Sequence, residues 1–136
     1  MAKRVTGRER PLAMIMISVL SVMGGLYSLL NSFLPVPSMF NPIVYHVFNL
    51  LSGVTMLAGS SLVLTGFTVG RPVLISGYIL ALLWLLVRIY AAPLMLNQIY
   101  LQIAFAFALW FSFSIYIAFG KKVREYFNPN YLPKKP

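Results

Sequence analysis

Apolar residues fill four long segments of the chain, which are separated by short breaks rich in proline and polar residues. The segments cover about residues 12–34, 43–67, 73–92 and 98–119. Each is close to the ~20 residues that an α-helix needs to cross a bilayer. The pattern therefore predicts an all-α integral membrane protein, with an antiparallel four-helix transmembrane bundle.

The breaks between the segments carry the residues expected at helix ends. Pro35 stops the first segment, and Asn41 followed by Pro42 is typical of an N-cap with proline at the first helical position. Pro72 is expected to open the third helix, and Pro93 to end it. Because the connections are short, neighbouring helices must run antiparallel.

All charged residues except Arg71 and Arg88 lie at the two ends of the chain, outside the apolar segments. They predict a basic N-terminus at 1–10, a membrane domain at 11–120 and a basic, Pro-rich tail at 121–136. The positive-inside rule places both termini and the turn at Arg71 in the cytoplasm. The residues expected to set this topology and to contact lipid head groups are Lys3, Arg4, Arg8, Arg10, Arg71, Lys121, Lys122 and Arg124.

The formal net charge of +9 does not point to nucleic acid, because the basic residues flank membrane segments. Reactive groups are scarce: there is one histidine, no cysteine, and neither carboxylate, Glu9 or Glu125, lies in an apolar segment. A carboxylate pair, a His-rich zinc site and a bis-histidine haem site cannot be built from this set. We therefore expect no enzyme, no metal and no cofactor.

Small residues recur at helical spacing in every segment, which favours close helix packing in lipid. They serve either the bundle of one chain or contacts between chains, and the spacing does not separate these alternatives. The sets are Ser21 and Gly25, then Ser52, Thr55 and Gly59, then Gly77 and Ala81, and finally Ala104, Ala108 and Ser112.

A second group of polar residues gathers near the non-cytoplasmic end of the expected bundle. At 100° per residue, Arg88 shares a helix face with Gly77, Ala81 and Trp84, so it is expected to point into the bundle if that face is packed. An alternative is that the long side chain snorkels to the head groups. The hypothesis of a pocket for a lipid phosphate or a quinone head group rests on Arg88, His46, Asn49, Gln102 and Asn31.

Two stretches resemble small four-span membrane proteins of prokaryotes. They are RPLAMI at 10–15, followed by Gly24-Gly25, and the middle turn at 70–72. The resemblance implies a four-helix fold in a prokaryotic plasma membrane, and it carries over no site residue. Small multidrug transporters have a similar length and span count, but their helix-1 carboxylate has no counterpart here.

Two functions from different classes remain open. The first expectation is a non-catalytic accessory subunit of a membrane complex, which packs through small-residue faces against other subunits or itself and contacts anionic lipids. The alternative is a stand-alone transporter or binder of an apolar or anionic solute, lipid or quinone in a pocket around Arg88. A third reading, an enzyme acting on lipid, requires catalytic groups from a partner.

Overall fold

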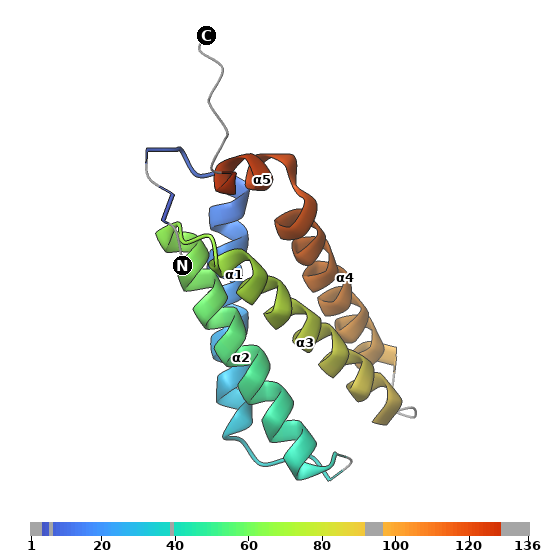
Figure 1. The fold of residues 1–136 in the computed structure, drawn as a ribbon. Helices are drawn as coiled ribbons and strands as arrows, with labels where there is room; N and C mark the ends of the chain where they lie inside the picture. Colours follow the sequence, from blue (N-terminus) through green and yellow to red (C-terminus); the bar gives the residue numbers. More distant parts are fainter. Residues whose placement is uncertain (1–3, 6, 39, 92–96, 129–136) are drawn as a thin grey trace.

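The computed structural model describes residues 4–5, 7–38, 40–91 and 97–128, with Ala91 and 97–100 described by their backbone alone. Within these ranges the chain forms helices and no strand (Figure 1). The helices are α1 (Leu12–Ser32), α2 (Pro42–Thr65), α3 (Gly70–Ala91), α4 (Asn97–Phe119) and the short α5 (Lys121–Phe127). Helices α1 to α4 are long and apolar enough to cross a membrane, which confirms the predicted four-helix membrane bundle.

Helix ends follow the predicted capping residues with small shifts. The Asn41 side chain accepts hydrogen bonds from the backbone N–H groups of Ile43 and Val44, at 3.0 and 3.4 Å. Gly66 ends α2 in the left-handed conformation, with φ of 85°. Helix α3 begins at Gly70, before Pro72, because a proline in the first turn removes only an N–H group that has no helical partner.

Glycines bring α1 and α2 into close contact. A Cβ atom added at Gly25 would lie 3.1 Å from the carbonyl oxygen of Gly53, and one added at Gly53 would lie 3.0 Å from that of Gly25. The two glycines therefore face each other across the helix pair. At this distance the two backbones attract each other by van der Waals forces, which are a main source of helix association in lipid.

Glycines also allow close contact between α2 and α3, at two positions along this helix pair. A Cβ atom at Gly59 would meet the backbone of Leu74, and one at Gly77 would lie 2.9 Å from the backbone nitrogen of Met56. Between these positions Ser21 of α1 reaches Tyr78 of α3, with 2.5 Å between their hydroxyl oxygens. The predicted small-residue faces of the first three helices therefore lie at contacts within the chain.

Helix α4 is less enclosed than the other three. It contacts α3 and α5, and its predicted small residues Ala104, Ala108 and Ser112 are exposed rather than packed within the chain. Figure 1 shows that α3 and α4 diverge from α1 and α2 towards the end opposite α5. The bundle is therefore tight at the α5 end and wider at the other.

At the α5 end of the bundle, arginine side chains cap the C-termini of three helices. The last four carbonyls of a helix lack intrahelical partners, and a cation near them is stabilising. Arg10 donates to the carbonyl of Leu64 in α2, Arg8 donates to that of Glu125 in α5 at 2.9 Å, and Arg71 donates to that of Ile117 in α4 at 2.9 Å. These arginines, predicted as topology signals, are thus also helix caps.

The tail residues that follow α4 fold back onto the bundle. Gly120 separates α4 from α5, and the α5 side chains of Val123, Tyr126 and Phe127 are buried. Val123 and Tyr126 join the apolar core that contains Met14 of α1. The stretch 121–127 of the predicted tail is therefore a packed helix, whereas Lys3 and residues 129–136 lie outside the described residues.

We expect Gly59→Ala to lower the free energy of unfolding by about 1–3 kcal/mol, since the added methyl group meets helix backbone that cannot move aside. Unfolding by SDS in mixed micelles measures this change. Ala58→Leu, on the exposed side of the same helix, is the control and should leave stability nearly unchanged. Equal stability of Gly59→Ala and the wild type would contradict the close α2–α3 contact.

Candidate functional site: a cavity around Arg88

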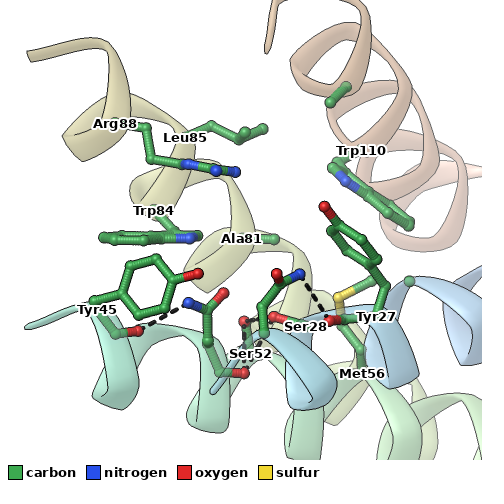
Figure 2. A pocket seen from close by; sticks show the side chains of 14 residues that line it. Tyr27, Ser28, Tyr45, Ser52, Met56, Ala81, Trp84, Leu85, Arg88 and Trp110 are labelled. Atoms are coloured by element: carbon green, nitrogen blue, oxygen red, sulfur yellow. Dashed lines mark hydrogen bonds between the residues drawn. The ribbon is translucent and has the colours of Figure 1, made fainter. Parts of the chain in front are cut away.

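A cavity of about 140 Å³ lies where the two helix pairs diverge. All four long helices contribute to its wall (Figure 2). This volume is close to the ~150 Å³ of a protein cavity that holds benzene. The Arg88 cavity, as we name it, is lined by Gly24, Tyr27, Ser28, Asn31, Tyr45, Asn49, Ser52, Met56, Ala81, Trp84, Leu85, Arg88, Ala106 and Trp110.

Arg88 places its guanidinium group over the ring of Trp84, at 5.9 Å from Cζ to the ring centroid. Figure 2 shows the group extending across the cavity between Trp84 and Leu85. A cation over an indole face gains about 0.5–2 kcal/mol, depending on its hydration. No residue in the described part of the chain accepts a hydrogen bond from Arg88 or forms an ion pair with it.

Packed aromatic rings hold Trp84 in place beneath the guanidinium group. The indole stacks on Phe48 with 5.5 Å between centroids and an interplanar angle of 16°. The indole also packs against the ring of Tyr45 in a T-shaped arrangement, with 5.6 Å between the ring centroids. Because Trp84 is only 5% exposed, it forms a fixed wall, and the position of Arg88 depends on it.

The serine and asparagine donors of the cavity are already used within the protein. Ser28 and Ser52 join α1 to α2, with 2.8 Å between their hydroxyl oxygens. Asn49 donates to the carbonyl of Tyr45, and Asn31 to that of Tyr27, both at 2.9 Å. These groups therefore shape the cavity wall and leave few donors of their own for a ligand.

The side chains of Arg88, Tyr27 and Tyr45 form no hydrogen bond with a described residue, and neither do the indole N–H groups of Trp84 and Trp110. A guanidinium group with two phenols nearby suits oxygen atoms that carry negative charge or belong to a carbonyl. Tyr27 is 65% exposed and lines the cavity on the side where α1 and α4 make few contacts. The site therefore combines a cationic centre with a rim that lies close to the lipid phase.

Glycine also shapes the far wall of the cavity. A Cβ atom at Gly24 would lie 2.5 Å from the ring of Trp110, so this indole rests directly on the α1 backbone. Trp110 stacks on Tyr78 with 5.7 Å between centroids. Trp110 thus brings α4 into contact with α1 beside the cavity.

The structure brings together three of the five predicted pocket residues, Arg88, Asn49 and Asn31. His46 does not line the cavity, since its Nδ1 atom pairs with the carbonyl of Ser32 at 2.7 Å and ties the start of α2 to the end of α1. Gln102 is exposed on α4 and also does not line it. Both residues lie at the expected level of the bundle but on other helix faces.

The pocket hypothesis did not include several residues that line the cavity, among them Tyr45, Ser28, Ser52 and Trp110. Helical spacing contained part of the signal, because Tyr45, Asn49 and Ser52 follow one another at intervals of four and three residues. Trp110 had no such signal, since its position depends on the contact with Gly24. No metal-binding group of three His, Cys, Asp or Glu residues occurs within the described residues.

The chain matches no protein-family model, no curated protein and no solved structure. The functional argument therefore rests on the cavity and on the charges around it.

Proposed function

We propose that the protein is a membrane-embedded binding protein for an amphiphile whose head group carries anionic or carbonyl oxygens. Arg88 is the central contact, and Tyr27 and Tyr45 are further donors. The proposal is one of binding without catalysis. Both carboxylates of the chain, Glu9 and Glu125, lie at the other end of the bundle, so no acid–base pair faces the ligand.

The observation that supports this proposal is the unopposed charge of Arg88 in a half-enclosed cavity between helices. A cation in a membrane span costs about 2.5–3.5 kcal/mol on insertion scales unless water or an anion compensates it. Contact with Trp84 offsets only part of this cost. An anionic or strongly polar head group would offset the remainder.

The dimensions of the cavity restrict how much of a ligand enters it. A volume of about 140 Å³ admits a head group or a single ring, but not a long acyl or isoprenoid chain. The chain of the ligand would leave past Tyr27 into lipid. A lipid phosphate and a quinone ring both satisfy these limits, and the donor set favours the phosphate because its charge opposes that of Arg88.

We expect Arg88→Gln to reduce binding of oleoyl lysophosphatidate at least ~10-fold, since a charge-assisted hydrogen bond is worth about 1.5–3 kcal/mol. Native mass spectrometry of the detergent-solubilised protein measures the bound lysophosphatidate. Stability should change little, because no described residue depends on a hydrogen bond from Arg88.

Arg124→Gln is the matched control, since it removes an exposed arginine from α5 at the other end. Since Arg124 contacts head groups only at the surface, this variant should reduce lysophosphatidate binding far less than Arg88→Gln does. A short-chain ubiquinone serves as the second probe and tests the carbonyl alternative. Unaltered binding of both probes to a folded Arg88→Gln variant would rule out the cavity as the binding site.

We further propose that the α5 end faces the cytoplasm, in the plasma membrane of a prokaryote. Arg8, Arg10, Arg71 and Lys122 all lie at this one end, as the positive-inside rule requires. The prokaryotic setting rests on the resemblance of the first span and the middle turn. Under this orientation the Arg88 cavity lies in the non-cytoplasmic half of the membrane.

Because the chain contains no cysteine, single cysteines test this orientation directly. We expect a membrane-impermeant maleimide added to intact cells to label Ser38→Cys, in the α1–α2 connection, and not Lys121→Cys. Both positions are exposed, so both should react after the membrane is opened. Labelling of Lys121→Cys alone in intact cells would reverse the orientation.

An accessory subunit is the second candidate, and the exposed small-residue face of α4 supports it. Ala104, Ala108 and Ser112 are exposed, and the Ser112 hydroxyl donates only to the carbonyl of Ala108 in the same helix, whereas similar faces of α1 to α3 pack against neighbouring helices. If the protein is an accessory subunit, it should co-migrate with other chains at a fixed stoichiometry after extraction in mild detergent. Migration as an isolated monomer, with Ala108→Leu behaving as the wild type, would count against it.

A further inference from the structure

A second cavity lies at the α5 end, between residues 7–12 and α5. Its volume is about 680 Å³, and its lining includes Arg10, Leu12, Lys122 and Tyr126. We call it the interfacial groove. It is separate from the Arg88 cavity, since the two share no lining residue and lie at opposite ends of α1.

Both carboxylates of the chain line this groove. The sequence has two acidic residues against eleven basic ones, and Glu9 and Glu125 both occur here, from segments far apart in the sequence. Neither carboxylate forms an ion pair or hydrogen bond with a described residue. The groove therefore places two negatively charged carboxylates beside the exposed cations Arg10 and Lys122. Arg8 also lines it, but its guanidinium group donates to the backbone carbonyls of Glu125 and Tyr126.

The groove lies where the first span begins. Leu12 is the first residue of α1 and is 71% exposed, and Met16, one turn further along, is 58% exposed. A four-residue step keeps these side chains on one side of the helix. A molecule in the groove thus has a charged site at the membrane surface and an apolar path along α1 towards the bilayer centre.

We infer that the interfacial groove binds a phospholipid whose head group carries a primary ammonium, as in phosphatidylethanolamine. The phosphate would contact Arg10 and Lys122, the ammonium would donate to Glu9 and Glu125, and the acyl chains would follow Leu12 and Met16. An anionic lipid such as phosphatidylglycerol fits less well, because it supplies no cation for the carboxylates. A choline head group supplies charge but no N–H donor.

The test compares phosphatidylethanolamine, phosphatidylcholine and phosphatidylglycerol with identical acyl chains, each added to delipidated protein and counted by native mass spectrometry. We expect the ethanolamine lipid to bind about ten-fold more tightly than the other two. The double variant Glu9→Gln/Glu125→Gln should lose this preference while it keeps general phospholipid binding. The variant should fold, because Arg8 caps α5 through backbone carbonyls and not through the Glu125 side chain.

Lys122→Gln should weaken all three lipids, whereas Lys121→Gln, an exposed neighbour that does not line the groove, should leave the preference for the ethanolamine lipid unchanged. Soluble phosphoethanolamine, added as a separate competitor, should not displace the lipid at equal concentration. Equal binding of the glycerol and ethanolamine lipids, an unchanged preference in the double variant, or equal competition by soluble phosphoethanolamine would each overturn the inference. Lysophosphatidate binding at Arg88 is independent of all three results.

Discussion

The absence of water from the hydrocarbon core is the constraint on which the rest of this structure depends. Backbone polar groups in the core must pair within their own helix, and only the last carbonyls, at the membrane surface, are free to take donors from side chains or water. At the α5 end, Arg8, Arg10 and Arg71 supply them, each to a different helix. Arg8 and Arg10 thereby hold the N-terminal segment against α5 and α2, and Arg71 holds the start of α3 against the end of α4.

In lipid, the size of the side chains at each level decides how closely the helices approach one another. Gly25 meets Gly53, and Gly59 meets Leu74, so α1, α2 and α3 are close along their shared length. Towards the opposite end the large rings of Trp84 and Trp110 stand between helices. The resulting divergence of the two helix pairs creates the cavity that contains Arg88 (Figure 2).

Hydrophobic pattern and capping residues were sufficient to predict the four helices and the Asn41 cap, because these depend on local geometry. The faces of His46 and Gln102 were not predicted, because they depend on how neighbouring helices cross. Arg8 and Arg71 cap helices through carbonyls that are far away in the sequence, so no local sequence pattern predicts these contacts. The packed helix α5 was missed for the same reason, since its buried side chains meet Met14 of α1.

The central claim is that Arg88 faces a cavity within the bundle rather than the lipid head groups. Solid-state NMR in bilayers, with ¹³C at arginine Cζ and ¹⁵N in the indole rings, tests this most directly. The account predicts an arginine–tryptophan contact between Arg88 and Trp84, since Cζ of Arg88 lies 5.9 Å from the centroid of that ring. Trp84→Phe should remove this signal. Absence of any such contact in the folded wild type would show that Arg88 has left the cavity, and would contradict the account.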